Sequence, residues 1–249
     1  MCNPYLPGMK ILDGSPEYII IEQADPRLKP EEWKQGLSKI LLRAKKQSLQ
    51  RIQAVLLRDG RNYENLANEL IRRGFVYYSS KVDVYRNLSG LTDQTSMFQW
   101  LSLKDETLTE AEFIEIWREC MLLSDNTPSS LTMEQHLQSV KKELGSGWEY
   151  SCRVFYDNKG PKGISIPHIE PGTSNEGRLF YFGVLPQERF KGSGTKMHGQ
   201  SLSFLKEMGA EYYIGSTHLA NQKMQRVFEK NGCEAKAYTD VFYKYFEHK

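Results

Sequence analysis

The 249-residue sequence predicts an α/β protein in which a mixed, mostly antiparallel sheet is flanked by helices. Two observations predict this class. Strand patterns rich in aromatic and β-branched residues alternate with helical apolar patterns along the chain. In addition, "NELIRRGFVYYSSKVDVYRNL" aligns with "RVFEKNGCEAKAYTDVFYKYF" at Gly74 and Gly232, and such self-similarity indicates an internal duplication. We therefore expect a tandem repeat, partial in the first half and complete in the second.

The N-terminal half is predicted to run strand, helix, strand, helix and then strands. These segments are 17–21, a helix around 31–48, 53–59, 62–75 and 76–88. Because only sixteen residues precede the first strand, this copy is expected to lack the early elements of the complete one. The loop-forming stretch "SGLTDQTS" follows at 89–96. The expected domains are therefore 1–95 and 96–249.

The second half begins with a short strand at 98–103 and two helices. The first helix, 109–121, opens with the capping box Thr109-x-x-Glu112. The second opens with Thr132-x-x-Gln135 and stops at Gly145. Apolar residues recur at helical spacing in both, so each helix is expected to bury one face.

Strands and two further helices complete the second half. The predicted strands are 148–157, 162–170, 178–184, 211–216 and a strand pair in 234–246. One helix follows the loop after 184 and ends at Gly209, and the other opens at Asn221 and stops at Gly232.

Composition and charge exclude several classes of protein. No apolar run approaches the ~20 residues that span a bilayer, and the N-terminus shows no signal-peptide pattern. The four cysteines are scattered, which is typical of reduced thiols, so a cytoplasmic protein is expected. The net charge is only +2. The basic helix face of Lys39, Arg43 and Lys46 is interpreted as a solvated surface, so nucleic-acid binding is not favoured.

The stretch "RFKGSGTKMH" at 189–198 predicts an anion site. Glycines at 192 and 194 let the backbone turn its N–H groups toward a ligand, and the helix that follows adds its positive end. Arg189, Lys191 and Lys196 supply charge nearby. The spacing fits neither a Walker loop nor a dinucleotide fingerprint. A glycine-rich turn with no ligand is the alternative.

Two spaced motifs in this half resemble those of the GNAT superfamily of N-acetyltransferases. Val184-Leu185-Pro186 followed by Arg189-x-x-Gly192-x-Gly194 resembles the family's V-x-P…[QR]-x-x-G-x-[GA] signature. Asn221-x-x-Met224-x-x-x-Phe228-x-x-x-Gly232 resembles its next block. The predicted element order is also the family's order. The resemblance covers residues 96–249 in full and 17–88 as a truncated, degenerate copy.

The resemblance implies that acetyl-CoA is the cosubstrate. The pyrophosphate would lie on the loop and the pantetheine arm along the fourth strand of this copy, with Asn221 hydrogen-bonded to the coenzyme. The implied coenzyme-binding residues are Phe182, Val184, Leu185, Arg189, Phe190, Lys191, Gly192, Ser193, Gly194, Thr195 and Asn221. Gly183 is the expected position of a bulge that would splay this strand from the next.

Three departures from the family pattern matter. Phe228 stands where the family usually has a tyrosine that protonates the leaving thiolate, so either another group such as Tyr181 donates or the thiolate leaves without help. Phe190 stands where the family often has glycine. The first copy lacks the glycine pair, and its Glu31 and Glu32 would repel a pyrophosphate. That copy is therefore expected to bind no coenzyme.

Catalysis needs a base, because an amine with a pKa near ~10 must lose a proton before it attacks. His168 and Tyr181 are the catalytic candidates, with Glu170 and His218 nearby in the predicted cleft; His168 and Tyr181 fit the core equally well. His136 and His198 are interpreted as structural or exposed. No cluster has metal-binding spacing, so no metal is expected, and direct attack in a ternary complex is preferred.

These observations predict an enzyme that moves an acetyl group from acetyl-CoA to an amine. The alternative is a non-catalytic acyl-CoA-binding module, a sensor or assembly part. The acceptor is expected to be a small-molecule amine or a peptide, with no membrane partner, and the sequence leaves both its identity and the oligomeric state open.

Overall fold

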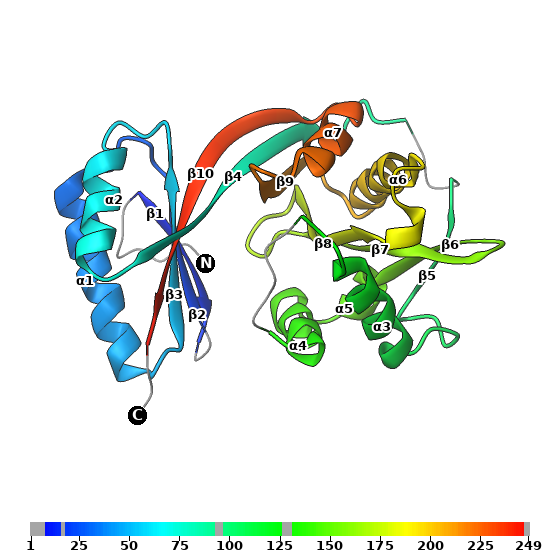
Figure 1. The fold of residues 1–249 in the computed structure, drawn as a ribbon, viewed down its shortest axis with the longest axis horizontal. Helices are drawn as coiled ribbons and strands as arrows, with labels where there is room; N and C mark the ends of the chain where they lie inside the picture. Colours follow the sequence, from blue (N-terminus) through cyan, green and yellow to red (C-terminus); the bar gives the residue numbers. More distant parts are fainter. Residues whose placement is uncertain (1–7, 16–17, 93–96, 126–130, 247–249) are drawn as a thin grey trace. The chain divides into compact units, whose positions relative to one another are not determined.

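The computed structural model describes residues 8–15, 18–92, 97–125 and 131–246. The chain divides into two compact units (Figure 1). Unit 1 contains residues 1–83 and 235–249, and unit 2 contains residues 84–234. Among the described residues, no helix combines the length and apolar character needed to cross a bilayer.

Unit 1 is a sheet in the order β1-β2-β3-β10-β4, with α1 and α2 packed on one face (Figure 1). Its elements are β1 Met9–Gly14, β2 Tyr18–Gln23, α1 Pro30–Lys46, β3 Arg51–Leu57, α2 Tyr63–Arg72, β4 Val76–Asn87 and β10 Glu234–Tyr245. Trp33 and Leu37 of α1 pack with Leu66 of α2 on Ile19 and Ile52 of the strands, all fully buried. Burying these side chains at roughly 1.5–3 kcal/mol each stabilises the unit.

The sheet of unit 2 has the strand order β9-β8-β7-β6-β5, and Val84–Asn87 of β4 add a further strand. Its strands are β5 Gln99–Ser102, β6 Arg153–Asp157, β7 Gly160–Ile169, β8 Glu176–Val184 and β9 Tyr212–His218. Its helices are α3 Glu110–Met121, α4 Met133–Leu144, α5 Trp148–Ser151, α6 Ser193–Glu207 and α7 Gln222–Lys230, with a 3-10 turn at Pro186–Glu188. The mixed sheet flanked by helices is confirmed.

Alternation along β6 assigns the two faces of the unit 2 sheet. Val154 packs in the cluster that contains Phe113 and Leu137 of α3 and α4. Its neighbour Phe155 packs instead with Phe204 of α6. Because successive strand residues point to opposite faces, α3 and α4 cover one face and α6 covers the other.

Several predicted boundaries are confirmed at the helix ends. Thr109 and Thr132 both form complete capping boxes, and Gly145 ends α4 with a φ of 65°. A capping side chain satisfies backbone N–H groups that the first helical turn leaves without acceptors, which fixes where the helix starts.

Three local predictions are wrong. Residues 148–151 form the helical turn α5 rather than the start of a strand, because Gly147 adopts a φ of 86° and reverses the chain just before it. Residues 9–14 form β1, so a strand precedes the first one predicted. Residues 234–245 form a single long strand rather than a pair.

The last strand joins the sheet of unit 1. From Thr239 to Tyr245, β10 pairs antiparallel with residues 57 to 51 of β3. The expected boundary at 95 placed this strand in the second domain, whereas the contacts place its residues from 235 onward in the first unit and place residues 84–92 in the second. Periodicity identifies a strand but not its neighbours, because pairing is set by tertiary packing. The expected division of roles between the two domains stays a prediction.

Candidate functional site

A cleft of about 600 Å³ opens in unit 2 where two parallel strands separate. The ladder between β8 and β9 holds only the pairs Glu176–Tyr212 and Gly177–Tyr213. Beyond them the cleft is lined by residues from β8, β9, the loop before α6, α7 and the end of α3. Loss of the ladder therefore creates a slot between two strands, a common position for a ligand.

The register of β8 explains part of this separation. Ser165 pairs with Phe182 and Pro167 with Leu179, so β8 has one more residue than β7 between these pairs. The bulge therefore lies at Phe180–Tyr181 rather than at the predicted Gly183. A bulge increases the local twist of its strand, which turns the end of β8 away from β9.

Gly183 instead makes room for a side chain. It pairs in register with Ile164, and a Cβ at this position would lie 2.8 Å from the Tyr181 hydroxyl and 2.9 Å from Cβ of Cys120. The Tyr181 ring therefore lies over the Gly183 backbone. Any larger residue at 183 would displace this ring from the cleft wall.

The glycine loop and the start of α6 form one end of the cleft lining. Phe190 and Gly192 both have left-handed backbones, with φ of 62° and 81°. Gly192 is the N-cap of α6, with no side-chain cap and no acidic residue in the first turn. The first N–H groups of a helix have no acceptor within it and carry its positive dipole end. Gly192, Gly194 and Thr195 line the cleft, so the loop is suited to an anion.

Phe190 adopts the backbone conformation of a glycine. For a residue with a Cβ this conformation costs about 1–2 kcal/mol. The ring is 85% exposed, and Nζ of Lys223 lies 5.3 Å from its centroid. Backbone strain of this kind is typical of functional loops.

The charge near the loop differs from the sequence expectation. The Arg189 guanidinium donates to three carbonyl oxygens: Val184 at 3.0 Å, Leu123 at 2.8 Å and Cys120 at 3.0 Å. It therefore ties the end of α3 to the loop. Lys191 pairs with Glu188 at 3.7 Å and, like Lys196, lies outside the cleft lining.

Three of the four cations in the described cleft lining come from α7. They are Lys223, Arg226 and Lys230, and the fourth is Arg189 from the loop. Lys223 is paired with Asp125 at 3.1 Å. The sequence analysis missed these α7 residues, although their spacing of three and then four positions puts them on one face of a helix, which is the signal that could have found them.

Phe182 and Val184 of β8 line the cleft as predicted. Leu185 does not, because it is 1% exposed and packs in the cluster beneath α3 and α4. Ser193 also lies outside the lining. Asn221 lines the cleft, and its Oδ1 accepts a hydrogen bond from the Met224 N–H at 3.0 Å, which caps α7. Its side chain therefore orients this helix against the cleft.

Two tyrosines line the cleft. Tyr181 packs against Trp117 at 5.3 Å between ring centroids, and burial raises its pKa. Tyr213, which the sequence analysis missed, is 2% exposed, and burial raises its pKa also. Both hydroxyls keep their protons at neutral pH and serve as hydrogen-bond donors.

Phe228 lies beside the second tyrosine. Its ring contacts His198 at 5.4 Å and Tyr213 at 6.4 Å between centroids, and it lines the cleft. Nε2 of His198 lies 3.4 Å from the Tyr213 hydroxyl. His198 is fully buried, and burial, aided by Arg86, lowers its pKa to about 3. It is therefore neutral at physiological pH.

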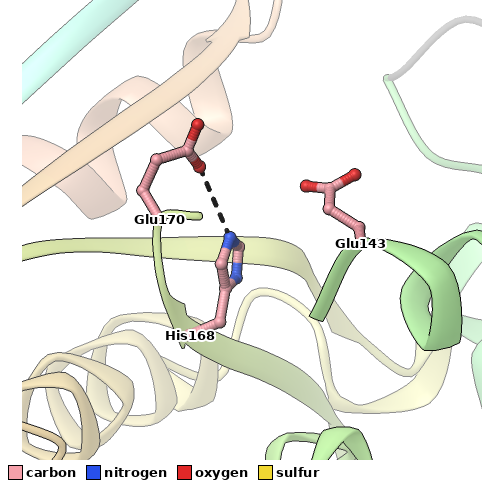
Figure 2. A group of neighbouring side chains, drawn as sticks. All are labelled: Glu143, His168 and Glu170. Carbon is pink, nitrogen blue, oxygen red and sulfur yellow. Dashed lines mark ion pairs between the residues drawn. The ribbon is translucent and has the colours of Figure 1, made fainter. Parts of the chain in front are cut away.

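His168 is not part of the cleft lining. It is buried on β7, with Nε2 3.6 Å from Oε2 of Glu170 (Figure 2). Its ring is 6.5 Å from that of Phe180, which does line the cleft. The structure thus separates the two catalytic candidates: Tyr181 faces the cleft and His168 lies behind its wall.

Cys120 is the one cysteine of the described cleft lining. Burial raises its pKa to about 12. Because the thiolate is the nucleophilic form of cysteine, this thiol is unsuited to carry an acyl group.

Comparison with known proteins identifies the fold. No family model and no curated protein matches the sequence. Among solved structures, a GCN5-related N-acetyltransferase from Sphaerobacter thermophilus is similar, with a TM-score of 0.62, 12% identity, and coverage of 95% of this chain and 76% of that one. One from Kribbella flavida has a TM-score of 0.57 and 12% identity, covering 97% and 88%.

A tandem GNAT protein from the clavulanic acid biosynthesis pathway is also similar, with a TM-score of 0.60 at 13% identity, covering 97% of this chain and 79% of that one. At such identities the likeness shows the fold. The chain has the fold of the GNAT N-acetyltransferases, as the sequence predicted. A tandem GNAT protein is among the similar structures, whereas the degenerate character of the first copy stays a prediction.

Proposed function

We propose that unit 2 is an N-acetyltransferase that moves an acetyl group from acetyl-CoA to an amine. The observation that carries this proposal is the uncapped start of α6 at the mouth of the cleft between β8 and β9. An elongated cofactor with a phosphate at one end and a thioester at the other fits such a combination. The fold supports the same assignment.

The coenzyme is proposed to lie along the cleft. Its pyrophosphate accepts hydrogen bonds from the N–H groups of Gly192, Gly194 and Thr195, and the α7 cations lie nearby. Its pantetheine arm follows the unpaired edge of β8 from Val184 toward Tyr181, where β9 no longer supplies a ladder partner. The thioester then lies among the two tyrosines.

The proposed reaction is direct transfer in a ternary complex. The amine nitrogen attacks the thioester carbonyl carbon, the carbon–sulfur bond breaks, and the thiolate leaves on CoA while the nitrogen loses a proton. The raised pKa of Cys120 supports this route over one through an acyl-cysteine.

Tyr181 is proposed to stabilise the departing thiolate. A thiol resembling cysteine has a pKa of about 8.5, below that of a buried tyrosine. The hydroxyl therefore donates a hydrogen bond to the thiolate rather than transferring its proton. Phe228 offers no such group, so Tyr181 takes the place of the tyrosine found at that position in the family the motifs resemble.

The acceptor is proposed to be a small-molecule amine or a peptide amine that reacts as the free base. Within the described cleft lining the only carboxylate is Asp125, which pairs with Lys223. The amine proton is then lost to water. The buried free thiols Cys120, Cys152 and Cys233 support a reducing compartment such as the cytoplasm.

The test measures thiol release from acetyl-CoA across a panel of amines, beside a calorimetric titration of CoA. Binding together with amine-dependent thiol release supports the enzyme. Binding without release for any amine, including peptides, supports the alternative, a non-catalytic acyl-CoA-binding module, which the absence of a hydroxyl at Phe228 favours. Absence of CoA binding overturns both.

A further inference from the structure

A cluster of three side chains lies behind the cleft wall, outside the proposed coenzyme site. Glu143 comes from the last turn of α4, His168 from β7 and Glu170 from the residue after it (Figure 2). One ligand atom of each lies within 4.8 Å of the others. The sequence analysis expected no metal site because it considered linear spacing, whereas the fold brings α4 to the end of β7.

His168 has an unmet bonding capacity. It is 5% exposed, and neither Nδ1 nor Nε2 has a hydrogen-bond partner among the described residues. The nearest carboxylate oxygen, Oε2 of Glu170, is 3.6 Å away, beyond a hydrogen bond. Buried polar groups nearly always have partners, so an imidazole without one, directed at two carboxylates, indicates a missing ligand.

The local charge favours a cation. Nε of Arg178 lies 2.6 Å from Glu176 and 3.4 Å from Glu170, and Glu143 adds a further carboxylate beside His168 and Glu170. The C-terminal end of α4 adds the negative end of a helix dipole beside Glu143. A divalent cation would be attracted to both the carboxylates and this helix end.

We propose that Glu143, His168 and Glu170 bind one divalent transition-metal ion of the zinc class. An imidazole nitrogen with two carboxylate oxygens is a donor set that suits Zn²⁺, Co²⁺ or Mn²⁺, whereas Mg²⁺ and Ca²⁺ prefer oxygen alone. Ligand atoms about 2 Å from the metal must lie somewhat closer to each other than they do here. Glu143 is exposed and can move inward to close the site.

The metal would join α4 to β7, the strand that pairs with the cleft-lining strand β8. Arg178 is the cross-strand partner of His168, and the strand continues from there into the cleft wall at Leu179. Fixing the end of α4 to β7 would therefore hold this wall in place. The site is distinct from the coenzyme loop, so it does not depend on the proposed function.

The experiment uses the full chain, dialysed against a chelator and then titrated with Co²⁺ and Zn²⁺. Co²⁺ is followed by its visible absorption, Zn²⁺ by calorimetry, and each by the shift in melting temperature that a ligand of the folded state produces. Glu143→Gln removes an exposed ligand without disturbing the core, and His168→Gln keeps most of the side-chain volume. Glu134→Gln and His136→Gln, both on α4 outside the cluster, are the matched controls.

We expect one ion per chain, affinity at least about tenfold weaker in Glu143→Gln and lost in His168→Gln, and unchanged affinity in both controls. The Co²⁺ spectrum should lack the charge-transfer band of a thiolate ligand. No binding by the wild type below about 100 μM overturns the proposal. So does undiminished binding in His168→Gln or Glu143→Gln.

Discussion

Two parallel strand pairs in the described part of the chain, β2 with β3 and β8 with β9, differ in the length of their ladders. In unit 1, β2 and β3 are paired over five residues, from Tyr18–Arg51 to Glu22–Val55. In unit 2, β8 and β9 are paired over two. In both pairs a helix connects the two strands. The connection is therefore of the same kind, whereas only β8 and β9 separate beyond their ladder. The candidate function therefore depends on where a ladder ends rather than on the elements present.

The helices that follow these strands also begin differently. At the start of α1, the Lys29 N–H donates to Glu32 at 3.2 Å, and Glu31 lies in the same turn. The helix thus supplies its own anions. The start of α6 has no acidic residue and no side-chain cap. A phosphate would meet repulsion at α1 and open N–H groups at α6.

The largest expected effect comes from filling the open helix start. Gly192→Val with Gly194→Val should block the approach of a phosphate, since a Cβ at 194 already lies 3.4 Å from Val184. Losing two hydrogen bonds to a charged group, at about 1.5–3 kcal/mol each, weakens CoA binding by more than about a hundredfold. Calorimetric titration measures the affinity.

Gly209→Val is the control for backbone strain. Its φ is 98° against 81° at Gly192, and both positions have open space for a Cβ. It lies past the other end of α6 and should cost stability without changing affinity for CoA. Equal loss of affinity in the two variants would show that strain, not the loop, is responsible.

The next largest effect concerns Tyr181 and Tyr213, which line the cleft because β8 and β9 separate. Tyr181→Phe should lower kcat by about 10²-fold, because it removes a donor to the departing thiolate, with little change in KM for acetyl-CoA. Tyr213→Phe should cost only a few-fold, because its hydroxyl faces His198. Tyr156→Phe on β6, outside the cleft lining, is the control. A larger loss of kcat in Tyr213→Phe than in Tyr181→Phe would indicate that Tyr213 donates to the departing thiolate.

The two units should also respond differently to acid. The described residues of unit 1 contain no histidine, whereas unit 2 buries His198, whose pKa burial lowers from 6.5 to about 3. Below pH 6.5 the unfolded state binds a proton that the folded state does not. The free energy of unfolding therefore decreases as the pH is lowered, by up to about 1.4 kcal/mol per pH unit. His198→Leu should flatten this fall in urea unfolding between pH 7 and 5. Parallel wild-type and variant curves would contradict it.

A smaller effect is expected from the cations of α7. Replacing Lys223, Arg226 and Lys230 by Gln should weaken CoA binding by up to about tenfold in total and reduce its salt dependence, because exposed charges act weakly and are screened. Lys191→Gln with Lys196→Gln, outside the cleft lining, is the comparison. A larger loss of CoA affinity in the Lys191 and Lys196 variant would show that the loop lysines attract the coenzyme, as the sequence analysis expected.

The last prediction is the absence of an effect. Calorimetry should find one CoA per chain. Glu31→Gln with Glu32→Gln removes the acidic residues from the start of α1 but leaves β2 and β3 paired. The stoichiometry should therefore stay at one. A second site in this variant would show that charge alone, rather than the closed ladder, excludes the coenzyme from unit 1.

Local signals in the sequence predict most of the fold and part of the site. Capping boxes at Thr109 and Thr132 and the glycine loop at 192–194 depend on neighbouring residues alone, so they can be found in the sequence. The carbonyl partners of Arg189 and the position of Tyr213 depend on how far strands separate. Alternation assigns a residue to a face of the sheet but cannot show which part of that face becomes a cleft.

Tertiary contacts account for what the sequence analysis missed. Glu143 and His168 belong to a helix end and a strand end that no periodicity links. Leu185 follows the strand directly, yet it lies in the core rather than the cleft, because the chain turns into the 3-10 segment Pro186–Glu188 just after it. Burial at such a turn is decided by packing.

The position of β10 affects how the protein is made. This strand lies between β3 and β4 in the sheet of unit 1, yet it is the last described element of the chain. During synthesis β3 and β4 leave the ribosome early. Their common neighbour β10 follows only after the rest of unit 2 has been translated. Until then their exposed edges invite pairing with other chains. A premature stop codon just before β10 would remove the centre of the N-terminal sheet while leaving every residue of the cleft encoded.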